Sequence, residues 1–329
     1  MHHRKRTLLL SLLIFAALFS CRVTQAFQLP APLVDGDWLQ QHSDEVVILD
    51  VRDDIESFTR KAVLVRKRFT GDLRLRVLGA HIPGAVLVDF LNIRTSREID
   101  GRRVRYMIPE KTEFEQLMQS WGVNNGDAIV IVSPATSNSD VTMATRLYWQ
   151  IKYFGHDNVA LLDGGMALWL LEQRPATIET QEPRTGTWTA GKERDGMIAS
   201  SDDVVMAIEN NDAQLVDTRS LGFYLGALKQ SYVRSKGHIP GAKVFPSELL
   251  TGARAPVMFA GAEDIKHMAS ELGIDATAEL ITYCNSGQWA SASWFVFSEL
   301  LGNSQARLYD GSMHQWALER RKLTSMKME

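Results

Sequence analysis

Cys284 is the residue best suited to nucleophilic chemistry in this chain of 329 residues. The other cysteine, Cys21, lies in a stretch with the pattern of a removable export signal, so the processed protein would hold one thiol. Cys284 ends the apolar run Leu280–Tyr283, and a short turn containing Gly287 leads to a helical segment, Ala290–Leu301. A strand, a glycine turn and a helix start bring backbone N–H groups together, where they stabilise an anion. Because the thiolate is the reactive form of cysteine, this pattern predicts a reactive thiol.

Taken alone, Cys284 fits an inert core position better, since free cysteine is among the most buried residue types. An internal repeat with a spacing of roughly 150 residues changes that interpretation. Four motifs occur twice in the same order: an apolar run with Asp-x-Arg (Val47–Arg52, Gln214–Arg219), His-Ile-Pro-Gly-Ala (His81–Ala85, His238–Ala242), an apolar strand (Ala128–Ser133, Leu280–Cys284), and Asp-Gly-Gly/Ser-Met followed by tryptophan (Asp163–Trp169, Asp310–Trp316). Ser133, or its neighbour Pro134, stands where the second copy has Cys284.

Short apolar runs alternate with helical segments in both copies, which predicts an α/β fold with mostly parallel sheets flanked by helices. The predicted strands are Val46–Val51, Ala85–Val88, Ile129–Val132, Val159–Leu162, Gln214–Thr218, Lys243–Phe245, Leu280–Tyr283 and Arg307–Leu308. The predicted helices are Lys111–Trp121, Val141–Phe154, Ser201–Glu209, Ala262–Leu272 and Ala290–Leu301.

The repeat divides the chain into four parts: a signal sequence over 1–26, a first domain over 27–178, a linker over 179–198 and a second domain over 199–329. The linker is placed in a polar stretch that contains Pro183, Gly186 and Gly191.

The four motifs together resemble those of a tandem-domain rhodanese, a sulfurtransferase, over nearly all of the chain after residue 26. The resemblance implies two rhodanese-like domains, of which the first is a non-catalytic scaffold and the second carries the nucleophile, Cys284. It also implies a two-stage reaction in which Cys284 takes the outer sulfur of a donor such as thiosulfate and passes it from a persulfide to an acceptor.

Each stage of that reaction places negative charge on sulfur, so the loop after Cys284 must stabilise an anion. The predicted binding loop is Asn285, Ser286, Gly287, Gln288, Trp289 and Ala290. Its backbone N–H groups and the helix start can serve this purpose without a cationic side chain. Trp289 is expected either to form a wall of the pocket or to pack at the domain interface.

Asp217 and Arg219 are expected to support the site beside the cysteine strand. The same pair recurs as Asp50 and Arg52 in the copy without a cysteine, which favours a structural ion pair over electrostatic tuning. His81 and His238 both lie in a turn-like His-Ile-Pro-Gly sequence and are interpreted as structural. No His/Cys cluster has the spacing of a metal site, so neither a metal nor another cofactor is expected.

The loop departs from the family in ways that leave the donor open. It lacks the Arg or Lys typical of thiosulfate-preferring rhodaneses and the full Cys-Gly-Ser-Gly pattern of 3-mercaptopyruvate relatives, and Phe223 stands near the point where an arginine often occurs. Since an anionic donor needs positive charge nearby, at least one of Lys229, Arg234 and Lys236 is expected to face the pocket. Thiosulfate is the preferred donor, with 3-mercaptopyruvate as the alternative and cyanide or a thiol as acceptor.

Two other functions are alternatives. Phosphatases with a rhodanese-like fold carry a Cys-x5-Arg motif, in which the arginine binds phosphate through two hydrogen bonds. The sixth residue after Cys284 is Ala290, so this arginine is missing. A persulfide carrier without turnover, docking to a protein acceptor, stays open. The net charge of −3 and the absence of a basic stripe argue against nucleic-acid binding.

The N-terminus has a basic start (His2–Arg6), an apolar run (Leu8–Phe19) and a small-residue end at Ala26. This predicts cleavage after Ala26, export (to the periplasm in a bacterium) and no stable membrane span afterwards. An uncleaved N-terminal membrane anchor and a lipoprotein processed at Cys21 are the alternatives.

Overall fold

The structure is a computed structural model that describes residues 27–326. The predicted signal sequence, with Cys21 and Ala26, lies outside the described residues.

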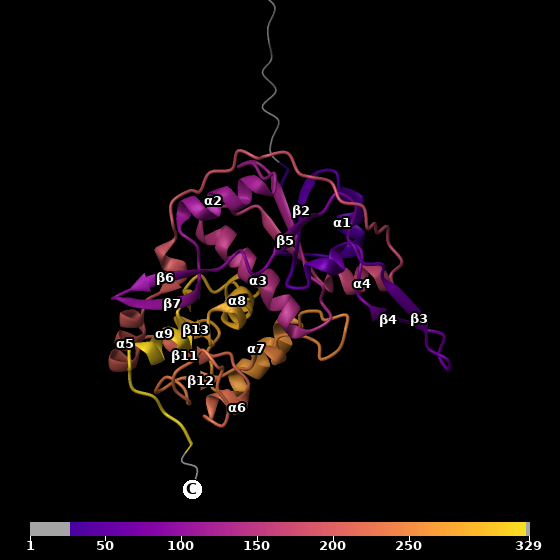
Figure 1. The fold of residues 1–329 in the computed structure, drawn as a ribbon. Helices are drawn as coiled ribbons and strands as arrows, with labels where there is room; N and C mark the ends of the chain where they lie inside the picture. Colours follow the sequence, from indigo (N-terminus) through magenta and orange to yellow (C-terminus); the bar gives the residue numbers. More distant parts are fainter. Residues whose placement is uncertain (1–26, 327–329) are drawn as a thin grey trace, which may run out of the picture.

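Two five-stranded parallel sheets form the centres of two similar halves (Figure 1). The first has the strand order β1-β9-β8-β2-β5 and the second the order β10-β14-β13-β11-β12, so the strands correspond one to one. The first sheet consists of β1 (Leu33–Val34), β2 (Val46–Arg52), β5 (Val86–Asp89), β8 (Ala128–Val132) and β9 (Val159–Leu162). The second consists of β10 (Ile198–Ala199), β11 (Gln214–Asp217), β12 (Lys243–Val244), β13 (Leu280–Tyr283) and β14 (Ala306–Tyr309).

Helices cover these sheets. Those of the first half are α1 (Gly36–His42), α2 (Lys111–Ser120), α3 (Asn138–Tyr153) and α4 (Gly165–Leu171). Those of the second half are α5 (Ser201–Asn210), α6 (Leu221–Tyr224), α7 (Ala262–Glu271), α8 (Gln288–Phe295) and α9 (Ser312–Leu318). Short 3₁₀ turns occur at Ile55–Phe58, Asp195–Met197 and Ser247–Leu249.

The predicted α/β fold is confirmed, because each predicted strand and helix corresponds to an observed element. Every residue of β8 and β13 is buried, which explains why these central strands read as continuous apolar runs. The helix predicted over Ala290–Leu301 differs in detail: it begins two residues earlier and continues after Phe295 as a π-helical turn, Val296–Leu300.

The two halves pack closely against each other. Helix α3 packs against α8 between the sheets (Figure 1), and one apolar cluster runs through both halves, while each half also has a separate apolar cluster. Polar groups are also joined across this contact: Thr145 Oγ1 lies 2.8 Å from Ser291 Oγ, and Arg146 forms an ion pair with Asp310. The equivalent helices therefore bring the start of α3 close to the start of α8.

Two hairpins of the first half were not predicted. One is β3 (Val63–Arg66) with β4 (Leu73–Val77), and the other is β6 (Thr95–Ile99) with β7 (Arg102–Met107). The turn of the second hairpin is Asp100-Gly101, with φ of 49° and 70°. An Asp-Gly pair between strands is a strong hairpin signal that the sequence analysis did not use. Hairpin β6–β7 extends toward the second half, where β7 contacts α9 (Figure 1).

The segment between α4 and β10 runs over the first half and past α2 (Figure 1). Trp188 in this segment is buried, its backbone N–H donates to the Val123 carbonyl at 3.0 Å, and the Gln119 side chain donates to its carbonyl at 2.8 Å.

Within residues 27–326, no helix combines the length and apolar character needed to cross a bilayer.

Candidate active site

Cys284 lies at the carboxyl end of β13, beside a cavity of about 170 Å³. The side chain is 2% exposed, and Sγ accepts a hydrogen bond from the backbone N–H of Ser286 at 3.4 Å. The cavity is lined by Ser139, Gln230, Tyr232, Cys284, Asn285, Ser286, Gln288 and Trp289. The thiol is therefore nearly inaccessible to solvent but borders a cavity, whereas an inert core thiol would be surrounded by packed side chains.

Gly287 gives the loop its shape. Its φ of 77° lies in the left-handed region, and a Cβ added there would lie 2.5 Å from both Arg146 Nη1 and Asp310 Oδ1. A side chain at this position would therefore collide with a buried ion pair. Helix α8 begins directly afterwards at Gln288, so the loop after Cys284 is very short.

Ser312 holds the loop from behind, a role that the sequence analysis did not assign. Its buried Oγ accepts hydrogen bonds from the N–H groups of Cys284 (3.0 Å) and Gly287 (3.2 Å) and donates to the Tyr309 carbonyl (2.8 Å). The Gly287 N–H is thus engaged by a hydroxyl, which corrects the expectation that the N–H groups of the whole loop converge on sulfur. Within residues 27–326, the loop N–H that donates to Sγ is that of Ser286.

The other predicted loop residues surround the cavity in different ways. Asn285 is buried, and its Oδ1 has no hydrogen-bond partner among the described residues. Trp289 lines the cavity and meets the Phe223 ring edge-on at 6.2 Å, which agrees with the pocket-wall interpretation. An aromatic pair therefore occupies the place where the family often has an arginine. Ala290 is fully buried in α8, and its carbonyl accepts from Thr282 Oγ1 at 3.1 Å.

Asp217 and Arg219 form a buried ion pair with two contacts, Nε–Oδ1 at 2.8 Å and Nη2–Oδ2 at 2.6 Å, and Arg219 also donates to the Gly237 carbonyl at 2.8 Å. The pair Asp50–Arg52 has the same two distances and the same third bond, to the Ala80 carbonyl. Identical geometry in the half without a thiol favours the structural role.

His81 and His238 also have matching surroundings. Each donates its Nδ1–H to a backbone carbonyl, that of Phe58 at 2.8 Å and that of Tyr224 at 2.7 Å, and each stacks on the aromatic ring of that same residue. These contacts are those of structural histidines. Within the described residues, no group of three His, Cys, Asp or Glu side chains could hold a metal ion.

The predicted cations Lys229, Arg234 and Lys236 are exposed and do not line the cavity beside Cys284. Lys236 donates instead to the Ala227 carbonyl at 3.2 Å. The expectation that one of them faces this cavity is therefore not met in the structure. Their neighbours Gln230 and Tyr232 line it instead.

Tyr232 is a further residue of the site that the sequence analysis missed. Its hydroxyl lies 3.2 Å from Ser286 Oγ, and its ring packs against Tyr106 of hairpin β6–β7. Burial raises the pKa of Tyr232 to about 12, although the bond to Ser286 opposes this rise. The phenol is therefore neutral at pH 7 and able to donate a hydrogen bond at the mouth of the loop.

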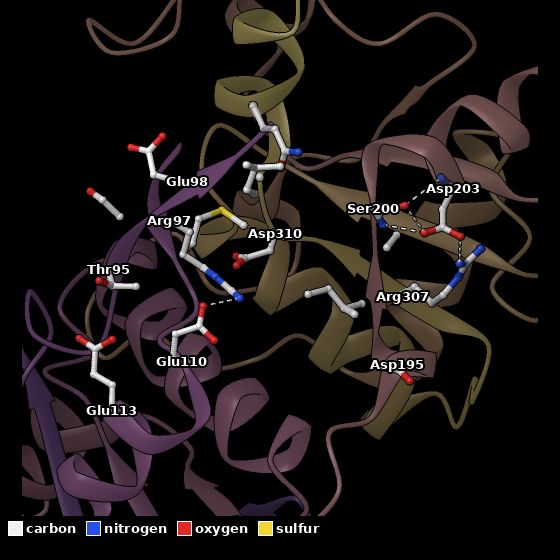
Figure 2. A pocket seen from close by; sticks show the side chains of 17 residues that line it. Thr95, Arg97, Glu98, Glu110, Glu113, Asp195, Ser200, Asp203, Arg307 and Asp310 are labelled. Carbon is white, nitrogen blue, oxygen red and sulfur yellow. Dashed lines mark hydrogen bonds and ion pairs between the residues drawn. The ribbon is translucent and has the colours of Figure 1, made fainter. Parts of the chain in front are cut away.

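A larger cleft of about 740 Å³ lies between hairpin β6–β7 and the second half (Figure 2). Its charged lining is mainly acidic: Glu98, Glu110, Glu113, Asp195, Asp203 and Asp310 against Arg97 and Arg307. Both arginines are engaged by carboxylates, Arg97 by Glu110 at 2.5 Å and Arg307 by Asp203 at 3.1 Å. Cys284 is not part of its lining, and the negative charge makes this cleft unsuited to an anionic donor.

The register of the two halves is fixed by matching backbone bonds. The Met313 N–H donates to the Cys284 carbonyl at 3.0 Å, and the Met166 N–H donates to the Ser133 carbonyl at 2.8 Å. Ser133, rather than Pro134, is therefore the structural counterpart of Cys284.

A family model for the rhodanese-like domain matches the chain twice, over residues 35–172 and 200–319. The chain belongs to the rhodanese family. This confirms the resemblance drawn from the four repeated motifs and the prediction of two tandem rhodanese-like segments.

Relatives of similar length agree with this assignment. A Saccharopolyspora erythraea protein named "Putative thiosulfate sulfurtransferase" is 32% identical over 86% of this chain and 92% of its own. The Thermus thermophilus "Sulfur carrier protein TtuD" is 30% identical over 87% and 94%. The crystal structure of the Escherichia coli 3-mercaptopyruvate sulfotransferase SseA shares the fold, with a TM-score of 0.69, 23% identity, and coverage of 86% of this chain and 98% of that one.

Proposed function

We propose that this rhodanese-family protein is a sulfurtransferase that moves a sulfane sulfur through a persulfide on Cys284. One observation carries the proposal: the thiol of Cys284 accepts a loop N–H at the edge of a cavity, whereas Ser133 holds the equivalent place in the first half. A backbone N–H aimed at sulfur favours the anionic forms through which such a transfer passes.

The chemistry balances with thiosulfate as donor. The Cys284 thiolate attacks the outer sulfur, the sulfur–sulfur bond of thiosulfate breaks, and sulfite leaves with the bonding electron pair. The product is a negatively charged persulfide, which transfers its terminal sulfur to cyanide or to a thiol and regenerates the thiolate. With 3-mercaptopyruvate the carbon–sulfur bond breaks instead, and the leaving group takes up the thiol proton to become pyruvate.

The residues of the site have separate tasks in this scheme. Ser286 donates its N–H to the sulfur, and Ser312 keeps the loop in position by accepting two N–H bonds. Tyr232 is held by Ser286 and borders the space that the donor would occupy. We expect a small donor to enter the cavity of about 170 Å³ beside Cys284 and the terminal sulfur of the persulfide to face the same cavity.

The decisive experiment combines mass spectrometry with kinetics. Purified protein is incubated with thiosulfate and, separately, with 3-mercaptopyruvate, and we expect the mass of Cys284 to increase by one sulfur atom with thiosulfate as the better donor. Cys284→Ser should show neither the adduct nor transfer to cyanide, with turnover reduced by at least about 10³-fold. Absence of an adduct with both donors, or full activity of Cys284→Ser, would overturn the proposal.

A second candidate function is a persulfide carrier that delivers sulfur to a protein acceptor. It is favoured by the relative whose name is sulfur carrier protein. A carrier would form the Cys284 persulfide in the same experiment but transfer it to small acceptors only slowly. The rate of cyanide turnover therefore separates the two functions.

We also propose that residues 1–26 direct export, on the basis of their basic, apolar and small-residue regions. Intact-mass analysis of the protein recovered from its native cells would test this. A chain that starts at Phe27 is expected, whereas a chain retaining residues 1–26 or a lipid-modified Cys21 would contradict cleavage at Ala26.

A further inference from the structure

Arg94 of the first half lies against the loop that holds the thiol. It directly precedes β6, and its Nη1 donates to Gln288 Oε1 at 3.3 Å. Gln288 is in turn part of the lining of the Cys284 cavity. The guanidinium also lies over the Phe90 ring, 4.1 Å from its centroid, and near the Tyr106 ring at 5.0 Å. These two rings hold the charge at the boundary between the halves.

The positive charge of Arg94 is not neutralised within residues 27–326. It forms no ion pair with a carboxylate there, and its buried Nε has no hydrogen-bond partner. Burial and repulsion from Arg146 lower the pKa of Arg94 to about 10, while attraction to Tyr232, Tyr106 and Cys284 opposes this change. The half-buried side chain is still charged at pH 7, and removing a charge from water in part without a counter-ion is costly. An anion beside Arg94 would remove that cost.

Further arginines surround the same place. Arg94 lines a shallow depression of about 480 Å³ together with Leu91, Thr95, Ser96, Arg103, Arg105 and Tyr106. No carboxylate belongs to this lining, in contrast to the acidic cleft on the other side of the hairpin. Tyr106 connects the depression to the thiol cavity, because its ring packs against Tyr232 at 5.0 Å.

We propose that Arg94, assisted by Arg103 and Arg105, binds the anionic group of the sulfur donor, a sulfonate or a carboxylate, so that the first half supplies the cation and the second half the thiol. This inference rests on the proposed sulfurtransferase function. It replaces the exposed Lys229, Arg234 and Lys236 as the source of positive charge. Guanidinium groups suit this role, because they form charge-assisted hydrogen bonds with planar or tetrahedral oxyanions.

The inference can be tested without sulfur transfer, by alkylation of Cys284. Iodoacetate carries a carboxylate and iodoacetamide is a neutral molecule of similar size, so the ratio of their rates reports attraction of an anion to the thiol. Arg94→Gln should lower the rate with iodoacetate by about 10-fold or more and leave the rate with iodoacetamide within about twofold. Arg94→Lys keeps the charge and should retain most of the ratio.

The control variant is Arg66→Gln, which removes an exposed arginine from hairpin β3–β4. It should leave the ratio unchanged. Calorimetric titration with sulfite provides a second measurement, and Arg94→Gln should weaken sulfite binding by about 10- to 100-fold. In steady-state assays the same variant should raise KM for thiosulfate with little change in kcat.

An unchanged alkylation ratio together with unchanged sulfite affinity in Arg94→Gln would overturn the inference. The proposed function fails in a different way, when the unsubstituted protein forms no persulfide with either donor. The two outcomes can be distinguished. If the unsubstituted protein formed no persulfide but Arg94→Gln still lowered the ratio of the iodoacetate to the iodoacetamide rate, the anion site would be supported and the sulfurtransferase proposal would be contradicted.

Discussion

The loop after β8 and the loop after β13 occupy equivalent places in the fold, but their backbone N–H groups bind different acceptors. In the first half, Asp140 of α3 fills the loop: its Oδ2 accepts from the N–H groups of Thr136 (2.8 Å) and Ser137 (3.0 Å) and from the Thr136 hydroxyl (2.6 Å). In the second half, no carboxylate of residues 27–326 accepts a hydrogen bond from a loop N–H: the Ser286 N–H donates to Cys284 Sγ and the Gly287 N–H to Ser312 Oγ. The Asp310 carboxylate lies close to Gly287 but pairs with Arg146. The first loop is therefore held by a carboxylate, and the second by a hydroxyl and a thiol.

The turn that supports each loop differs by one hydroxyl. Gly165 in the first half and Ser312 in the second both have a φ of 48°, and both follow an Asp-Gly pair. A side chain at Gly165 would meet the Ser133 carbonyl at 2.3 Å, so serine does not fit there. Ser312 accepts two loop N–H groups that would otherwise be buried and unsatisfied. The comparison suggests a division of tasks in the second loop. The Ser286 N–H is available to the thiol, while the Ser312 hydroxyl accepts the hydrogen bonds of the N–H groups of Cys284 and Gly287.

Among the variants that compare the two loops, Gly287→Ala is expected to have the largest effect. The new methyl group would force the Arg146–Asp310 pair and the loop apart, and displacement of reacting groups by about 1 Å can cost about 10²-fold in rate. We expect kcat/KM to fall by about that factor, together with about 1–3 kcal/mol of unfolding free energy. Steady-state kinetics and urea denaturation measure the two losses.

The matched control for this prediction is Gly302→Ala. Gly302 has a φ of 75°, similar to that of Gly287, but a Cβ there would meet nothing within 4 Å. It should lose stability through backbone strain and keep its kcat/KM. Equal losses of activity in the two variants would show that strain alone, and not the close approach at the site, explains the effect.

Replacing Ser312 should make the second loop resemble the first. Ser312→Ala leaves two buried N–H groups without an acceptor, and we expect a loss of about 2 kcal/mol in unfolding free energy. Ser312→Gly removes the same acceptor but suits the left-handed φ, so it should be about 1 kcal/mol more stable than the alanine variant. Both should form the Cys284 persulfide more slowly, as measured by mass spectrometry over time.

If Ser312→Ala and Ser312→Gly both keep the original rate of persulfide formation, the hydroxyl has no part in positioning the catalytic loop. The comparison between the two turns would then concern folding stability alone.

Asp140→Ala tests the other side of the comparison. It removes the acceptor that satisfies the N–H groups of Thr136 and Ser137, and we expect a loss of about 1–2 kcal/mol in unfolding free energy. Because the first half carries no thiol, kcat should change by less than about twofold. A large drop in kcat at temperatures where the variant is folded would contradict a purely structural role for the first loop.

The smallest effect is expected from His314, whose counterpart in the first half is Ala167. His314 is buried, and neither ring nitrogen has a hydrogen-bond partner among the described residues. Burial lowers the pKa of His314 below the ordinary value of 6.5. The unfolded chain therefore binds a proton more readily, and this contribution to stability is present above pH 6.5 and lost as the pH falls through the lower, folded-state pKa.

His314→Gln cannot titrate, so its unfolding free energy should fall less than that of the unsubstituted protein between pH 7 and pH 5. Urea denaturation at several pH values measures the difference. His156 is also buried with a lowered pKa and contributes equally to both proteins, so it does not affect the comparison. Parallel pH profiles for the two proteins would show that His314 has the same pKa in the folded and the unfolded chain, which would contradict the prediction.

Much of this fold could be predicted because its main signals are local or repeated. Buried parallel strands such as β8 and β13 appear as continuous apolar runs, and four motifs in the same order connect the halves. The hairpin β6–β7 was missed because its strands are mostly polar and lack the continuous apolar run of the buried strands, although its Asp-Gly turn was visible.

The sequence by itself determined the two-fold repeat, the fold class, Cys284 as the thiol and Gly287 as the bend beside it. The tertiary structure decided which side chains from distant segments surround that thiol. Arg94 and Gln288 are 194 residues apart, and Arg146 and Asp310 are 164 apart, yet each pair is in hydrogen-bond contact. The periodicity of apolar residues in the sequence indicates only which face of a helix or strand is buried, and not which distant segment packs against that face. The docking of α3 against α8 sets the contacts between halves, and it gives the second loop a cation from the first half.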